Sequence, residues 1–363
     1  MYEILRYAIE KDASDVHITE NMIAWIRVQS QMERTDKVVQ LDMIDEFIKT
    51  QKPFLLEEYK LLKARKTKKA IDGAFWYADR RFRINTYLSI DGTNLSIRLL
   101  REKAPSLEEL FLPPEVKRFT NIKSGLYIVS GATGSGKSTT LAAFIRKINE
   151  ERSENIITLE DPIEYIHRPI KSRIVQIEVG LHAESFDEAI VSAMRQNPNI
   201  IFVGEMRNKE TIQNAINLAE TGHVVYGTLH AKSAIDSVER MIGVFSADQQ
   251  EQIRLQISKV LRGVLHQTLI KSKDSVVPLA EQMVVDEVVA SMILGKQKPN
   301  AIRDHLRSKG TVGNHHIVNN AVWHISEKRL TPEDVKPYLS HEDYNTVSAI
   351  IGEEHKRRGI FNA

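Results

Sequence analysis

Residues 124–138 read SGLYIVSGATGSGKS and contain the feature that decides the fold class. Within this stretch, Gly131–Ser138 fits the phosphate-loop pattern GxxxxGK[ST]. Its glycines let the backbone turn tightly, so several N–H groups can point at phosphate oxygens, and a following helix adds its positive N-terminal end. The apolar run Leu126–Val129 precedes the loop, and apolar residues at helical spacing follow it. The stretch therefore predicts a strand, a nucleotide-binding loop and a helix.

The loop residues have distinct expected roles toward bound ATP. Lys137 is expected to reach the β- and γ-phosphates and to take part in catalysis, and the Ser138 hydroxyl is expected to ligate Mg²⁺. The other contacts come from the loop and the first helical turn. The expected ATP-binding residues are Gly131, Thr133, Gly134, Ser135, Gly136, Lys137, Ser138 and Thr139.

Further along the chain, short apolar runs alternate with helical patterns. The runs cover residues 156–159, 200–203 and 224–226, and they lack polar alternation, which is typical of strands buried on both faces. Ser185 followed by Glu188 fits a capping box and predicts the start of a helix between two of these runs. Strands that alternate with helices predict a wound, mainly parallel α/β sheet.

Polar side chains follow the predicted strands. In open α/β sheets, ligands bind beyond the carboxyl ends of the strands. Glu205 follows the run 200–203 and is expected on the Mg²⁺ side of the nucleotide, whereas Glu160 follows the run 156–159 and is the candidate general base. Each could be a plain strand-end acid, but the nearby phosphate loop favours catalytic roles.

Two histidines, His223 and His230, bracket the predicted strand that begins at residue 224. One interpretation is a pair of nucleotide sensors that contact the γ-phosphate. The alternative is that both are hydrogen-bonded core or edge histidines. Their spacing differs from that of a helical zinc pair, and no third ligand is near, which argues against a metal site.

The first hundred residues differ from the rest, because they mix helix and strand signals. Apolar residues between Ile4 and Ile9 repeat at helical spacing, whereas residues 25–28 and 82–87 contain strand-like runs. Prolines at positions 105, 113 and 114 then indicate a domain boundary. We expect a smaller α+β domain over residues 1–103, a linker over 104–118, and an α/β domain with a helical tail over 119–363.

The composition argues against several classes of protein. The 363 residues include 50 Lys+Arg and 48 Asp+Glu, a net charge of +2 that does not favour nucleic-acid binding. Without cysteine, the chain has no disulfide, no Cys-ligated zinc and no thiol nucleophile. It has no run of 18 apolar residues and no secretory signal pattern. We therefore expect a cytoplasmic protein that is not inserted in a membrane.

Seven short motifs in a fixed order together carry a family resemblance. They are Ala13–Ile18, Arg81–Asn85, Gly131–Thr139, Leu159–Tyr165, Val203–Arg207, Ala219–His230 and Ala301–Arg307. In this order they resemble the motifs of secretion-superfamily hexameric ATPases, and within these the PilT-like type IV pilus retraction motors. Ile177, Asn208 and Ala231 depart from the family pattern, which commonly has Arg, Asp and Thr there.

The resemblance implies a PAS-like N-terminal domain and a RecA-like P-loop ATPase domain. It implies Mg²⁺-dependent ATP hydrolysis in a homo-hexameric ring, with ATP at each interface and arginines of the N-terminal domain completing the site. Arg83 and Arg98 are the candidates for these arginines. It also implies a motor that retracts pili through an inner-membrane platform protein, peripheral to the inner face of the cytoplasmic membrane and without nucleic acid.

Other functions remain open at this point. The same ATPase could drive assembly or secretion in a type IV pilus, competence, conjugation-pilus, type IVB or type II secretion system, because no motif specifies the direction of work. A nucleic-acid motor would need a basic channel or an aromatic stacking platform. A nucleotide-sensing scaffold would not need to retain both Glu160 and Glu205.

Overall fold

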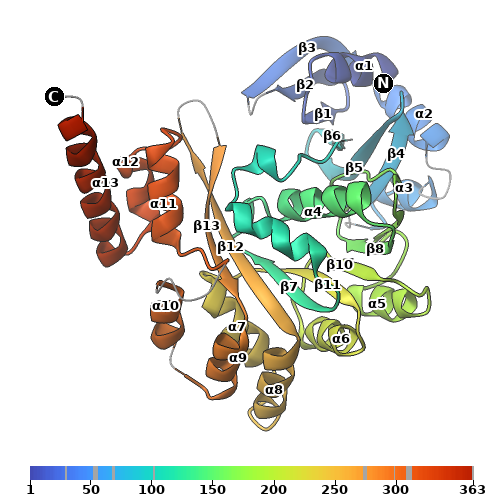
Figure 1. Cartoon of the computed structure of the whole chain (residues 1–363). Coiled ribbons are helices and arrows are strands. Elements are labelled where there is room, and N and C mark those ends of the chain that lie inside the picture. Colours follow the sequence, from blue (N-terminus) through green and yellow to red (C-terminus); the bar gives the residue numbers. More distant parts are fainter. Residues whose placement is uncertain are drawn as a thin grey trace. The chain divides into compact units, whose positions relative to one another are not determined.

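The computed structural model describes residues 1–28, 31–51, 56–67, 70–100, 103–272, 276–297, 299–307 and 313–361 (Figure 1). The chain folds into two compact units. The first holds Met1–Lys103 and Glu164–Ile166, and the second holds Ala104–Ile163 and His167–Ala363.

The first unit is built on a six-stranded sheet in the order β3-β2-β1-β6-β5-β4, in which every pair is antiparallel. Inward-facing Val16, Ile26 and Phe82 pack against Leu5 and Phe47 of the helices. The helix and strands predicted here are α1, β2 and β5. The elements are α1 (Tyr2–Glu10), β1 (Asp15–Thr19), β2 (Met22–Val28), β3 (Gln31–Val39), α2 (Leu41–Gln51), α3 (Leu56–Lys63), β4 (Ile71–Tyr77), β5 (Arg80–Ser89) and β6 (Gly92–Leu99).

The second unit contains a seven-stranded sheet in the order β13-β12-β7-β11-β10-β8-β9. The strands from β12 to β9 run parallel, and β13 pairs antiparallel with β12. The prediction of a mainly parallel α/β sheet is confirmed. The strands are β7 (Gly125–Ser130), β8 (Asn155–Glu160), β9 (Arg173–Glu178), β10 (Ile200–Val203), β11 (Val224–Leu229), β12 (Leu261–Lys271) and β13 (Val276–Val284).

Both faces of this sheet are buried, which explains the apolar runs without polar alternation. Leu126 and Ile128 of β7 pack in one apolar cluster, and Tyr127 and Val129 pack in another. Helix α4 (Lys137–Glu151) and the 3-10 helix η3 (Pro114–Asn121) contribute to the second cluster. The helices of the first cluster are α5 (Phe186–Met194), α6 (Lys209–Glu220), α7 (Ala234–Gly243), α8 (Gln250–Val260), α9 (Glu287–Leu294) and α10 (Pro299–Arg307).

Helix α5 begins at its predicted cap, although the capping box does not close. The Ser185 hydroxyl accepts a hydrogen bond from the Glu188 N–H at 3.2 Å. The Glu188 carboxylate accepts from the Glu184 N–H at 2.9 Å. The predicted N-cap is therefore confirmed, and the reciprocal bond goes to the preceding residue.

Residues 104–118, expected to be a linker, belong to the second unit. They include η2 (Glu108–Leu110) and the start of η3, and Leu107, Leu112 and Val116 are buried in the second cluster. Burial of each such side chain is worth about 1.5–3 kcal/mol, which is enough to dock a short segment. The segment predicted as a linker is therefore packed on the second unit by these side chains.

The chain ends in a helical tail of α11 (Ile317–Ser326), α12 (Pro332–Val335), η4 (Lys336–Tyr338) and α13 (His341–Phe361). Helix α11 packs on β13, at the edge of the sheet (Figure 1). Asn320 Oδ1 accepts from the Ala280 N–H at 2.8 Å, and His324 Nε2 donates to the Pro278 carbonyl at 3.1 Å. These bonds occupy backbone groups of the edge strand β13 that could otherwise pair with another strand. Among the described residues, no helix combines the length and the apolarity needed to cross a bilayer.

Candidate active site

The phosphate loop joins β7 to α4 through backbone conformations that glycine adopts readily. Gly131 has a φ of 147° and Gly136 a φ of 86°, both in the region that other residues rarely adopt. A Cβ atom on Gly131 would lie 2.3 Å from the backbone oxygen of Gln267, so a larger residue would displace β12. The positive φ angles therefore favour glycine at both positions, and the close packing on β12 also requires it at Gly131.

Lys137 begins α4 and is 8% exposed. Its ammonium group donates to the backbone oxygens of Gly131 at 3.0 Å and of Ala132 at 2.9 Å. The positive charge is thus held at the loop itself, where phosphate oxygens can replace these carbonyls as acceptors. Ser138 is exposed at the next position and Thr139 is half-buried, so the Ser138 hydroxyl is accessible to a ligand.

One further observation fits a bound phosphate. The Ser135 hydroxyl is buried and has no hydrogen-bond partner among the described residues, so a phosphate oxygen could satisfy it. In the described part of the chain, no group of three or more His, Cys, Asp or Glu side chains could hold a metal by itself. Mg²⁺ in nucleotide sites needs only one or two protein oxygens besides phosphates and water. Ser138 and Glu205 can supply such oxygens.

Glu205 follows β10 and lies between two partners. Arg207 Nε and Nη2 each lie 2.6 Å from one of its carboxylate oxygens, and His230 Nε2 lies 3.1 Å from Oε1. Burial raises the pKa of Glu205. The hydrogen bond from Arg207 and the charges of Arg207, His230 and Lys137 lower it by more than burial raises it, so the pKa lies below its usual value. Glu205 is therefore an anion at neutral pH, and only β11 separates its strand from the strand of the loop.

His230 follows β11, directly beside the start of the loop, because Leu229 pairs with Ser130. Burial and the charge of Lys137 lower the pKa of His230, and the opposing effect of Glu205 does not restore it. The pKa of His230 therefore lies below its usual value, and its Nε2 hydrogen-bonds Glu205 Oε1. This bond places His230 between the loop and the carboxylate.

Glu160 ends β8, and its Oε1 accepts from Thr158 Oγ1 at 2.7 Å and from Gln176 Nε2 at 3.0 Å. Strands β11 and β10 lie between β8 and β7. At roughly 4.8 Å per strand, the axes of β7 and β8 are about 14 Å apart. The two hydrogen bonds fix the direction of this carboxylate.

His223 lies at the opposite end of β11 from His230. It precedes Val224, the first residue of β11, so at about 3.3 Å per residue it is about 20 Å from the carboxyl end. Its Nδ1 lies 3.1 Å from the Leu218 carbonyl oxygen and 3.0 Å from Thr221 Oγ1. Of the two candidate nucleotide sensors, only His230 therefore lies beside the loop of its own chain. The hydrogen-bond partners of His223 are local, as in the structural alternative.

Known proteins share both this sequence pattern and this fold. The family model described as "Type II/IV secretion system protein" matches residues 1–358. The chain belongs to this family.

The relatives include proteins named for pilus retraction and for twitching motility. The type IV pilus retraction ATPase PilT of Pseudomonas aeruginosa is 33% identical over 321 residues, which cover 86% of this chain and 90% of that protein. A twitching motility protein of Neisseria gonorrhoeae is 44% identical over 194 residues, which cover 53% of this chain and 52% of that protein. A crystal structure of the pilus retraction motor PilT with bound ADP superimposes with a TM-score of 0.81 and 30% identity, covering 96% of each chain.

In this secretion-family chain, the two candidate arginines are cross-strand neighbours. Asp15, Arg98 and Arg83 lie opposite one another on β1, β6 and β5. Arg98 Nε donates to Asp15 Oδ1 at 2.9 Å, and Arg27 Nε lies 3.6 Å from Oδ2. Arg83 Nη2 lies 3.6 Å from Asp72 Oδ1. The Arg98 side chain is 65% exposed, and the two arginines, directly opposite each other on β5 and β6, lie on one face of the sheet.

One departure from the family pattern preserves the local structure. Asn208, where the family commonly has Asp, is the N-cap of α6, and its Oδ1 accepts from the Thr211 N–H at 2.8 Å. Asn and Asp cap helices about equally well. The change therefore leaves the start of α6, which follows Glu205, intact.

Two polar residues of β12 that contact the loop or the end of β7 were not predicted from the sequence. Gln267 is 1% exposed and hydrogen-bonds both the loop and α4. Its neighbour His266 has Nδ1 3.3 Å from Ser130 Oγ. The available signal was a polar pair inside an apolar strand, because buried polar side chains need partners.

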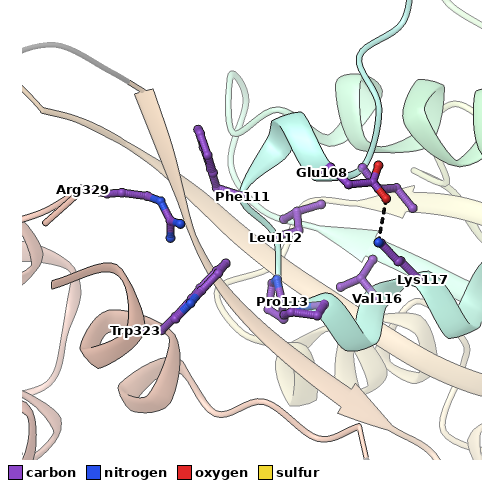
Figure 2. Close-up of a pocket in the computed structure, with 10 residues that line it drawn as sticks. Glu108, Phe111, Leu112, Pro113, Val116, Lys117, Trp323 and Arg329 are labelled. Atoms are coloured by element: carbon purple, nitrogen blue, oxygen red, sulfur yellow. Dashed lines mark ion pairs between the residues drawn. The ribbon is translucent and has the colours of Figure 1, made fainter. Parts of the chain in front are cut away.

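A separate cavity of about 280 Å³ lies between the segment 107–117 and α11 (Figure 2). The Arg329 guanidinium lies between two rings there, 4.8 Å from the centroid of Phe111 and 4.7 Å from that of Trp323. Glu108 and Lys117, which also line the cavity, form an ion pair at 2.6 Å. None of the residues at the strand ends lines this cavity, so it is distinct from the nucleotide site.

Proposed function

We propose that this chain is the ATPase of a hexameric motor that retracts type IV pili. One observation carries the proposal: the chain matches a pilus retraction motor over nearly its whole length. The site supports it, because Lys137, Glu205 and His230 gather at adjacent strand ends, beside a loop whose backbone fits phosphate. Nucleotide use follows from the same likeness, and the related motor was solved with bound ADP.

In this proposal, each site residue acts from its observed position. Lys137 exchanges its bonds to the loop carbonyls for bonds to the β- and γ-phosphates, which lowers the cost of charge developing there. Glu160, oriented by Thr158 and Gln176, accepts a proton from the attacking water. Ser138 and Glu205 would hold Mg²⁺, whose charge would offset the negative charge on the phosphates.

His230 is proposed as the residue that reports the state of the nucleotide. Its imidazole bonds Glu205 and stands beside the start of the loop. Loss of the γ-phosphate changes the charge near Lys137 and Glu205, and both charges act on His230. The hydrogen bond between His230 and Glu205 would therefore respond to hydrolysis, and the segment that follows His230 into α7 would respond with it.

We further propose that the working form is a homo-hexamer on the inner face of the cytoplasmic membrane, docked on a platform protein of the pilus. Arg83 and Arg98 would complete the ATP site of a neighbouring subunit, where a guanidinium group can neutralise γ-phosphate charge. Each hydrolysis step would then change one interface and move subunits against each other.

The biochemical part of the proposal can be tested on the purified full-length chain. We expect Mg²⁺-dependent phosphate release from ATP and a hexamer-sized particle by light scattering. Removal of Mg²⁺ with EDTA should abolish release. A folded protein that binds ATP but releases no phosphate at any Mg²⁺ concentration would refute the enzymatic assignment.

A further inference from the structure

One buried amide from a distant strand ties the phosphate loop to the following helix. Gln267 lies on β12, one residue beyond the point where His266 pairs with Ser130. Its Nε2 donates to the Ser135 backbone oxygen at 2.6 Å, and its Oε1 accepts from Thr140 Oγ1 at 2.8 Å. A single side chain therefore holds both the loop and the first turn of α4.

The bond to Ser135 sets the direction of the next N–H group. In a trans peptide, the carbonyl of one residue and the N–H of the next point in opposite directions. Because the Ser135 carbonyl faces Gln267, the N–H of Gly136 faces away from β12. Gly136 has φ 86° and ψ 15°, and successive N–H groups in such a loop are the ones that bind phosphate.

The backbone also packs closely against this strand at both ends of the loop. A Cβ atom on Gly131 would lie 2.3 Å from the Gln267 backbone oxygen, and one on Gly136 would lie 3.1 Å from Gln267 Nε2. The amide thus fills the space behind the loop and also fixes one of its peptide planes. A side chain that only filled space in the core would not need to hydrogen-bond the loop backbone.

We propose that Gln267 is a positioning residue for the nucleotide phosphates: by turning the Ser135–Gly136 peptide, it aims the Gly136 N–H at the bound phosphate. The inference rests on the proposed function, because it concerns the same nucleotide site. Gln267 touches no phosphate itself, so its loss weakens phosphate binding through the loop. The expected signature is a weaker nucleotide affinity in a protein that still folds.

The chain offers a matched control on the neighbouring strand. Gln282 of β13 is 0% exposed, and its Nε2 donates to the Gly313 backbone oxygen at 2.6 Å, away from the loop. Gln267→Met and Gln282→Met remove the same group from equally buried sites. We expect Gln267→Met to weaken Mg·ADP binding about tenfold, the worth of one well-placed hydrogen bond. Gln282→Met should leave the dissociation constant unchanged, although both variants lower the melting temperature.

Calorimetric titration of the full chain with Mg·ADP gives the answer. Equal dissociation constants for Gln267→Met and the parent would overturn the inference, and so would equal losses in the two Gln→Met variants. If Gln267→Met does not fold, Gln267→Asn takes its place. This variant keeps a neutral amide in the buried site, but its side chain is one methylene shorter and cannot bond both Ser135 and Thr140, so the same loss is expected and its absence would overturn the inference. A folded parent that does not bind Mg·ADP would refute the proposed function itself, and the inference with it.

Discussion

Replacing Glu205 with Gln separates the chemistry of the site from the stability of the fold. The change removes one negative charge and keeps the shape of the side chain. Arg207, its ion-pair partner, is 71% exposed, and an ion pair this open contributes about 0–1 kcal/mol. At about 2–4 °C per kcal/mol for a unit of this size, the melting temperature should fall by about 4 °C at most.

The expected effect on catalysis is much larger. An electrostatic group that acts on charge developing in the transition state is typically worth about 2.7–4 kcal/mol, or about a 100- to 1,000-fold change in turnover. We therefore expect Glu205→Gln to bind ATP and to hydrolyse it at least about a hundredfold more slowly. Steady-state phosphate release, ATP titration and thermal melting measure the three quantities on one preparation.

A control variant distinguishes loss of chemistry from loss of an ion pair. Glu239 of α7 is 40% exposed, and its Oε1 lies 3.2 Å from Nη1 of Arg254 in α8. Glu239→Gln should change the melting temperature by a similar small amount and leave turnover at the parental rate. Turnover by Glu205→Gln close to that of Glu239→Gln would show that the assigned role of Glu205 is wrong.

Three further predictions follow from the positions of the other site residues. Lys137→Ala should reduce turnover at least about a hundredfold with the circular dichroism spectrum unchanged, and parental phosphate release would rule out the phosphate-loop assignment. His230→Ala should slow ATP hydrolysis, whereas His223→Ala should only lower the melting temperature, because His223 bonds Leu218 and Thr221 at the far end of β11; equal losses of turnover would contradict this placement. Arg98→Ala mixed with Lys137→Ala should recover part of the ATPase activity if the arginine acts on a neighbouring subunit, and no recovery despite measured subunit exchange would place its action within one chain.

The phosphate loop and the strand-end acids could be predicted because their signals are local. Gly131–Ser138 specifies its own backbone shape, and an apolar run shows where each strand ends. In a parallel sheet the carboxyl ends of strands share one edge. Neighbours in the sheet, such as β11 and β10, therefore bring His230 and Glu205 within 3.1 Å of each other.

Other features of the site and the fold could not be predicted, because they depend on contacts that form only when the chain folds. His223 and His230 are close in sequence, but they lie at opposite ends of β11, and the sequence does not show that only His230 lies beside the loop of its own chain. Gln267 reaches the loop from a strand far along the chain, and nothing near Ser135 in the sequence indicates that contact. The segment 104–118 has the prolines of a linker, yet its buried Leu107, Leu112 and Val116 dock it on the second unit.

The most direct test of pilus retraction is a count of surface filaments on cells that lack this gene, complemented with the parent chain or with Glu205→Gln. A retraction motor predicts that the deletion strain keeps or gains filaments and loses twitching. The parent should restore motility and Glu205→Gln should not, because the latter binds ATP without turning it over. If the deletion strain has no filaments and only the parent chain restores them, this ATPase assembles pili. That result would contradict the assignment of retraction.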